Sequence, residues 1–282
     1  MQNLPARVSA IVIALGFLLN AHSLPAQSWK LVWSDEFNGA AASLPSSTDW
    51  NFVRGWGPQG NHEIEWYCQP GESDGPCDKT DPNLFEDGNG HLVVRAIHNN
   101  QLWSSARLNT QSKHTILYGR IEARLRMQPG AGFWPAFWLL GDNRETSHWP
   151  DCGEQDIMEW VQKYGPGTTS STIHGPGYSG AHGIGSTFAF PNGGRIDDAQ
   201  FHIYGMIWSK DRMAFYRDDP SKPYFVVTPA NLPPGTKWVY NHPFYVILNF
   251  AVGEAGFPGS VDATTPHTGT MWVDYVRFYQ QQ

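Results

Sequence analysis

The residues that could most clearly carry out chemistry lie in the stretch GEQDIMEW, which places three carboxylic acids among apolar side chains. Successive side chains of a β-strand alternate between its faces, so Glu154 and Asp156 would share a face while Glu159 would point to the other. A β-bulge at Ile157 and Met158 would return Glu159 to the first face, because two bulged residues oppose one residue of the neighbouring strand. We therefore predict a bulged strand that carries three acids along one stripe.

Carboxylates on a strand that lines a cleft have three common uses: solvated charge, metal ligation and glycoside hydrolysis. The apolar neighbours argue against a solvated edge, and a Ca²⁺ or Mg²⁺ site draws on turns and backbone carbonyls, to which aromatic neighbours contribute nothing. Cleavage of a glycosidic bond needs a carboxylate and a carboxylic acid flanking that bond. Three acids this close would repel one another, so at least one pKa should be raised, which suits a general acid. We expect a catalytic set.

The rest of the chain predicts the sheets that would position these acids. Short β-type runs recur throughout the sequence, and turn residues separate nearly all of them. In YGRIEARLRM the apolar positions alternate with charged ones, as in a strand with one solvated face. No helical periodicity of comparable strength occurs. We expect one all-β domain over residues 27–282, a jelly-roll sandwich of two antiparallel sheets with a concave substrate cleft.

Residues 1–26 are predicted to form a secretory signal peptide. Arg7 precedes the apolar run VSAIVIALGFLL, and small residues near Ala26 offer cleavage positions. The apolar run is too short for a comfortable membrane span. We therefore expect a secreted or periplasmic protein that has no membrane association after cleavage.

Composition bears on the partner of the protein. The formal net charge is −7, which argues against nucleic acid. Aromatic residues make up 14% of the chain and include 13 tryptophans, more than a core of this size ordinarily uses. Some of these rings should therefore be exposed for binding. We expect the protein to act as a monomer.

Three cysteines fall in the predicted mature chain, namely Cys68, Cys77 and Cys152. The Gly- and Pro-containing loop between the first two suits a short disulfide, which would stabilise the fold by about 2–4 kcal/mol. Pairings that involve Cys152 stay open at this stage. The absence of CxxC spacing argues against a zinc site.

The acidic stretch resembles the ExDxxE signature of glycoside hydrolase family 16, in its bulged, laminarinase-like branch. Other segments resemble the family in the same order along the chain, namely GNHEIEWY, YGRIEARLRMQPGAGFWPAFWLLG, HGPGYSG, FYVILNFAVG and VDYVRFYQ. The resemblance implies a jelly-roll sandwich with an open cleft and retaining endo-hydrolysis of β-1,3-glucosidic bonds in laminarin-type β-glucans, with no cofactor required for catalysis. The extra residue before Glu159 argues against the unbulged lichenase and xyloglucan branches.

Carried over by position, the resemblance implies that Glu154 is the nucleophile, that Glu159 is the acid/base, and that Asp156 hydrogen-bonds between them and tunes their charge. One position departs from the family pattern, because Gln155 stands where an apolar residue, commonly Ile, is usual. Its side chain should face away from the cleft. A buried amide that lacks hydrogen-bond partners there would cost about 1–3 kcal/mol.

The resemblance also implies six substrate contacts, namely Trp134, Trp138, Trp160, Asn61, Glu63 and His174. Each has a structural alternative. The tryptophans either stack on sugar faces or pack in the core. The asparagine and the glutamate either line the cleft or form a turn with an incidental acid. The histidine either hydrogen-bonds sugar hydroxyls or has a purely structural role.

A calcium site and two other functions complete the expectations. Glu36 and Asp274 resemble positions that help to bind a structural Ca²⁺ on the convex side of some family members, although Asp274 could instead hydrogen-bond its neighbouring strand. The same fold could act on mixed-linkage glucan or on a marine galactan. It could also be a non-catalytic β-glucan-binding lectin, but such members lack the two glutamates that this sequence has.

Overall fold

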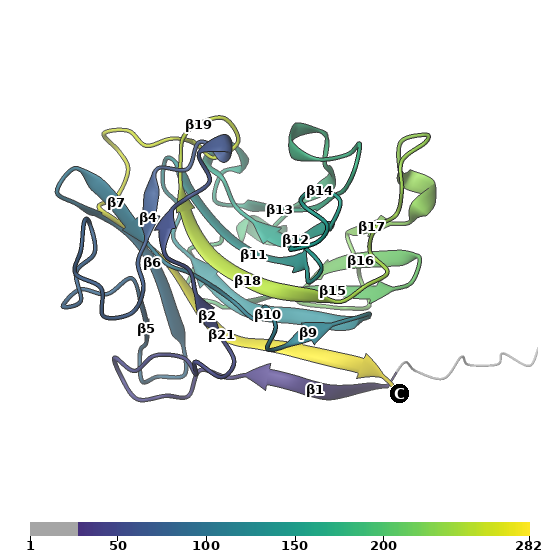
Figure 1. Ribbon diagram of the computed structural model, residues 1–282, viewed down its shortest axis with the longest axis horizontal. Helices are drawn as coiled ribbons and strands as arrows, with labels where there is room; N and C mark the ends of the chain where they lie inside the picture. Colours follow the sequence, from purple (N-terminus) through teal and green to yellow (C-terminus); the bar gives the residue numbers. More distant parts are fainter. Residues whose placement is uncertain (1–27) are drawn as a thin grey trace, which may run out of the picture.

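Two curved β-sheets stacked face to face make up the body of the protein (Figure 1). The structure is a computed structural model, and it describes residues 28–282. The predicted signal peptide lies outside these residues. Within them, no helix is long and apolar enough to cross a membrane.

The lower sheet in Figure 1, here called the convex sheet, has eleven strands. Their spatial order is β17 (Phe225–Val227), β16 (Arg212–Arg217), β15 (His202–Ser209), β10 (Gly119–Met127), β21 (Thr268–Gln281), β6 (Leu92–Asn99), β7 (Leu102–Ser105), β4 (Glu65–Tyr67) and β3 (Gly55–Trp56), with β1 (Trp29–Asp35) paired to β21 and β5 (Leu84–Glu86) paired to β6.

The upper sheet, here called the concave sheet, has eight strands. Their order is β14 (Ile184–Ala189), β13 (Thr168–His174), β12 (Glu154–Glu159), β11 (Phe133–Gly141), β18 (Phe244–Val252), β8 (Arg107–Asn109) and β2 (Asn51–Phe52), with β9 (Thr115–Ile116) paired to β18. A separate hairpin joins β19 (Glu254–Ala255) to β20 (Gly259–Ser260). Five short 3₁₀ helices lie in loops: η1 (Gln59–Asn61), η2 (Gln162–Tyr164), η3 (Gly180–His182), η4 (Pro191–Gly193) and η5 (Pro229–Asn231).

The predicted all-β sandwich is confirmed, with one difference in strand direction. Every pairing within the two sheets is antiparallel except that of β4 with β7, which is parallel. The alternation predicted for β10 is also present. Its apolar positions are buried in the core between the sheets, while Arg120, Arg124 and Arg126 are half-buried. Glu122 is the exception, because it is buried and accepts hydrogen bonds from the hydroxyls of Tyr216 and Tyr279.

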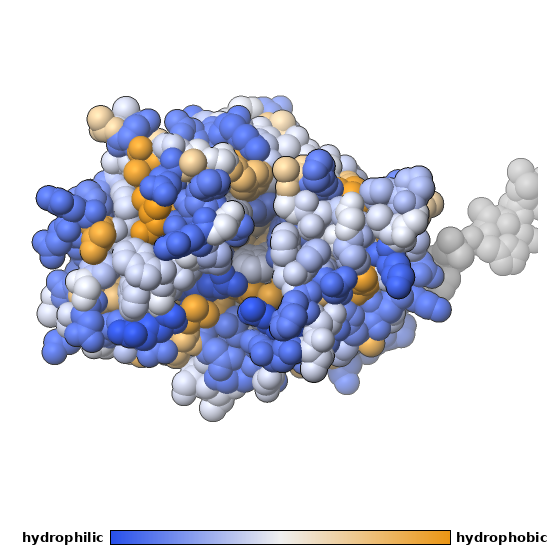
Figure 2. All heavy atoms as spheres, turned by 45° about the horizontal axis from the view of Figure 1, so that its top comes forward, coloured by the Kyte–Doolittle hydropathy of each residue, from blue (hydrophilic) through white to orange (hydrophobic). Residues whose placement is uncertain are grey.

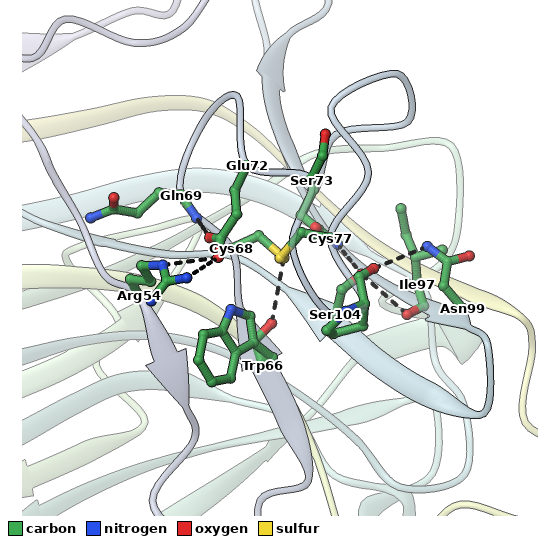
Figure 3. The surroundings of a disulfide bond; sticks show 12 residues. Arg54, Trp66, Cys68, Gln69, Glu72, Ser73, Cys77, Ile97, Asn99 and Ser104 are labelled. Atoms are coloured by element: carbon green, nitrogen blue, oxygen red, sulfur yellow. Dashed lines mark hydrogen bonds and ion pairs between the residues drawn. A yellow bond between two sulfur atoms is a disulfide. The ribbon is translucent and has the colours of Figure 1, made fainter.

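A disulfide closes the loop between β4 and β5, as predicted (Figure 3). It joins Cys68 to Cys77, whose Cα atoms are 5.8 Å apart. Within the same loop Glu72 forms an ion pair with Arg54 at 2.7 Å. The remaining cysteine, Cys152, is free and buried. The disulfide therefore ties down a long connection at the edge of the convex sheet.

Candidate active site

The bulge predicted in the acidic strand is present on β12. The neighbouring strand β13 supplies a single residue, Ser171, opposite Ile157 and Met158, between the partners of Asp156 and Glu159. The pairing of β12 with β11 shifts at the same place. The strand follows Gly153, whose φ of +73° is a left-handed conformation that glycine adopts without strain. The shift of one residue restores the acids to a common face, as the alternation of a strand requires.

The three acids are held in a desolvated position on the concave sheet. Asp156 and Glu159 are buried, and the Glu154 side chain is 18% exposed. Burial, followed by repulsion from Asp156, raises the pKa of Glu154 well above its usual range. Burial raises the pKa of Asp156 to about 8. Burial and then repulsion from Asp156 raise the pKa of Glu159 to about 8. Asp156 and Glu159 therefore retain protons at neutral pH, which is the condition for a general acid.

Two predicted contact residues lie directly against the trio. The Nε2 atom of His174 is 3.1 Å from a carboxylate oxygen of Asp156 and 3.8 Å from one of Glu154. His174 is placed there because β13 pairs it with Glu154. From β11, the indole N–H of Trp134 donates a hydrogen bond of 2.9 Å to Oε1 of Glu159. Each strand beside β12 thus contributes one polar partner.

A chain of hydrogen bonds links three other predicted contact residues, running from the concave sheet to β4 of the convex sheet and the segment before it. The indole N–H of Trp138 donates to Asn249 at 2.7 Å, and the Asn249 amide donates to the hydroxyl of Tyr67 at 3.2 Å. That hydroxyl donates to Oε2 of Glu63 at 3.0 Å, while the Asn61 amide donates to Oε1 at 3.2 Å. Both oxygens of Glu63 are therefore engaged within the protein, and its position depends on residues from distant strands.

Sequence reasoning missed several members of this surface. Asn249 and Tyr67 carry the hydrogen-bond chain, and the Arg107 guanidinium lies 4.9 Å from the centre of the Trp138 ring. The surplus of tryptophan did predict exposed rings, and two are found. Trp149 is 48% exposed, with its ring 6.4 Å from that of His174, and Trp56 is 50% exposed on β3.

The predicted sugar contact of Trp160 is wrong. Its side chain is 2% exposed and belongs to the core between the sheets. Its indole N–H donates to the Gly165 carbonyl at 2.8 Å. The physical reason is strand alternation, because a residue that follows Glu159 on the cleft face must point to the core.

The two predicted calcium ligands are each paired with an arginine. Arg277 holds Glu36 through two hydrogen bonds of 2.9 and 2.7 Å, and Arg124 forms an ion pair with Asp274. Each carboxylate is thus already neutralised by a guanidinium. In the described part of the chain, neither acid joins a group of three side chains with metal-ligand spacing. The alternative, in which Asp274 bonds a neighbouring strand, is the arrangement found.

Gln155 faces the core beneath the acids, as predicted, and is fully buried between Leu139 and Ile173 of the adjacent strands. Neither its amide nitrogen nor its amide oxygen has a hydrogen-bond partner in the structure. We therefore expect the departure from the usual apolar residue to destabilise the strand that carries the acids.

A β-sandwich whose concave sheet carries carboxylates along one face of a strand has the arrangement that glycoside hydrolases use. A model described as Glycosyl hydrolases family 16 matches residues 78–277, and the chain belongs to this family, in its laminarinase-like branch.

Relatives agree with this assignment. A beta-glucanase from Rhodothermus marinus is 31% identical, and the alignment covers 99% of this chain and 95% of that protein. The glucan endo-1,3-beta-glucosidase A1 of Niallia circulans is 30% identical over 89% of this chain, which spans 38% of that longer protein. Among solved structures, the catalytic domain of a laminarinase from Thermotoga petrophila RKU-1 is 36% identical, with a TM-score of 0.79 and coverage of 91% of this chain and 100% of that one.

Proposed function

We propose that this protein is a retaining endo-glycosidase that hydrolyses internal β-1,3-glucosidic bonds of laminarin-type β-glucans. The observation that carries the proposal is the bulge of β12, which sets Glu154 and Glu159 on one face with Asp156 between them. Retaining enzymes need two carboxyl groups about 5–5.5 Å apart across the bond that breaks. The names of the beta-glucanase and laminarinase relatives support the choice of linkage.

Glu159 is the proposed acid/base. Its pKa of about 8 keeps it protonated near neutral pH. Because the Trp134 N–H occupies Oε1, the proton is directed to Oε2, from which it passes to the glycosidic oxygen as the bond breaks. In the second step the Glu159 carboxylate removes a proton from water, and that water attacks the sugar. Activity should therefore fall as the pH rises through about 8.

Glu154 is the proposed nucleophile. In its ionised form it attacks the anomeric carbon and forms a covalent glycosyl-enzyme, which water then resolves with net retention. His174, whose Nε2 atom lies 3.8 Å from a carboxylate oxygen of Glu154, opposes the rise of the Glu154 pKa and so favours the ionised nucleophile. Asp156, with a pKa of about 8, would be neutral beside it, so that it does not repel the nucleophile.

The face that carries the acids is hollowed between two raised groups of loops (Figure 2). A hollow on this face would hold a stretch of polysaccharide, and the endo-1,3-beta-glucanase name of a structural relative supports endo cleavage. We also propose that the protein is secreted, on the strength of its N-terminal apolar run, and that it works as a monomer, since one chain supplies the whole trio. Secretion of the full chain and its elution volume in size exclusion test both points.

The deciding experiment incubates the purified chain with laminarin, barley mixed-linkage glucan and agarose. Reducing ends give the rate, and NMR gives the anomeric configuration of the first products. We expect β-anomers, chiefly from laminarin. Cleavage confined to another polymer would overturn the substrate while keeping the trio. Folded protein that cleaves none of them, yet binds laminarin, would indicate a lectin.

A further inference from the structure

The bulge that brings Glu159 to the cleft is fastened by a side chain. The hydroxyl of Ser171 donates a hydrogen bond of 2.6 Å to the backbone carbonyl of Ile157. Ser171 is fully buried, and it is the one residue of β13 that faces the two bulged residues. A bulge disrupts the regular ladder of backbone hydrogen bonds. Here the Ser171 hydroxyl donates a hydrogen bond to the carbonyl of a bulged residue, where the ladder is disrupted.

A second hydroxyl fixes the first. The hydroxyl of Tyr224 lies 2.5 Å from that of Ser171. Because Ser171 has one hydroxyl proton and gives it to Ile157, Tyr224 must be the donor in the second bond. Tyr224 comes from the edge of the convex sheet, where its N–H bonds the carbonyl of Phe215. The relay of Tyr224, Ser171 and the Ile157 carbonyl therefore connects the two sheets at the bulge.

The position of this relay gives it an unequal effect on the acids. Glu154 and Asp156 precede the bulge, and their alignment with His174 and Thr172 is regular. Glu159 follows the bulge, and a slip of one residue would turn its side chain to the core. We propose that Ser171 and Tyr224 are positioning residues for Glu159, an inference that rests on the proposed role of Glu159 as the acid/base. The relay holds the proton donor in place and leaves the nucleophile alone.

This inequality can be measured with two substrates. Laminarin has a poor leaving group and needs protonation by Glu159. A 2,4-dinitrophenyl β-laminaribioside has a leaving group so good that its first step needs no acid. We expect Ser171→Ala to lower kcat/KM on laminarin by about tenfold or more, since small misplacements of a catalytic group are costly. The same variant should leave kcat/KM on the aryl substrate within about twofold, because Glu154 is undisturbed.

The matched control is Ser105→Ala. Ser105 is also fully buried, and its hydroxyl also donates to a backbone carbonyl, that of Phe250 on β18, which lies two strands away from the bulged strand β12. Both variants should lower the melting temperature, but only Ser171→Ala should change the ratio of the two kcat/KM values. Ser171→Thr keeps the hydroxyl and should restore much of the laminarin activity. Tyr224→Phe should change the ratio of the two kcat/KM values in the same direction by a smaller factor. It replaces Ser171→Ala as the test variant if Ser171→Ala does not fold.

Equal ratios for Ser171→Ala and Ser105→Ala, with Tyr224→Phe matching wild type, would overturn the proposal. Failure of the proposed function looks different. In that case Glu159→Gln itself would not separate the two substrates, or wild type would not cleave laminarin at all.

Discussion

Acids on the two faces of this molecule are held in opposite ways. On the convex side, Glu36 and Asp274 are each bound by an arginine, and the hydrogen bonds from Arg277 lower the pKa of Glu36. On the concave side, the trio on β12 has no arginine or lysine ion-pair partner among residues 28–282, and the imidazole of His174 lies 3.1 Å from Asp156. Burial without a counterion raises the pKa of these acids, whereas pairing lowers it. The neighbours of an acid, more than its spacing, decide whether it can move protons.

The largest expected effect comes from neutralising the cleft acids. Glu159→Gln should lower kcat on laminarin by about 10²–10⁴-fold, and Glu154→Gln by at least as much. The matched convex variant, Glu36→Gln, should stay within about twofold of wild type because it touches no reacting atom. Reducing-end assays on all three give the comparison. If Glu36→Gln were as inactive as the two cleft variants, the proposed difference between the acids of the two faces would be contradicted.

The next effect concerns stability and pH. The folded-state pKa of Asp156, about 8, lies above its usual 3.8, so its contribution to stability is present at low pH and is lost as the pH rises toward 8. Asp156→Asn removes this loss. As the pH rises from 5 to 8, the free energy of unfolding of the variant should therefore increase relative to that of wild type by about 2–4 kcal/mol. Urea unfolding at the two pH values measures the gain. Glu36→Gln should show no such trend, because a lowered pKa acts only in acid; a trend of the same size there would contradict the reasoning.

A smaller effect is expected beneath the acids. Gln155→Ile removes a buried amide whose two polar atoms lack partners. The free energy of unfolding should rise by about 1–3 kcal/mol. Activity should be retained, since the side chain faces away from the cleft. Leu139→Gln, which adds an amide at a neighbouring core position, is the inverse control and should destabilise. A loss of stability in Gln155→Ile would show that the amide has a partner in solution.

The smallest effect belongs to the convex ion pairs. Arg277→Met should cost about 1 kcal/mol or less, because the pair with Glu36 is partly exposed to water. A chelator should leave the melting temperature unchanged, since both predicted calcium ligands are bound by arginine. If added Ca²⁺ raises the melting temperature and chelator reverses the rise, Ca²⁺ displaces the arginines from the two carboxylates, and the expectation is wrong.

Local patterns predicted what depends on a few consecutive residues. The bulge followed from the parity of Glu154 and Glu159 along one strand, and the disulfide followed from its short loop. The same parity, applied one residue further, places Trp160 in the core, so that error was avoidable. Other contacts could not be predicted, because the partners come from remote parts of the chain. Asn249 meets Tyr67 across 182 positions, and Glu36 meets Arg277 across 241.

The central strand of the convex sheet has a consequence for biosynthesis. β21 pairs with β1, β10 and β6, and its Gln281 lies opposite Trp29 of β1. A ribosome therefore releases β1, β6 and β10 long before the strand that joins them exists. During that interval the strand edges that will pair with β21 have no partner, a state that favours aggregation and recruits chaperones. The convex sheet can therefore close only after β21 has been synthesised.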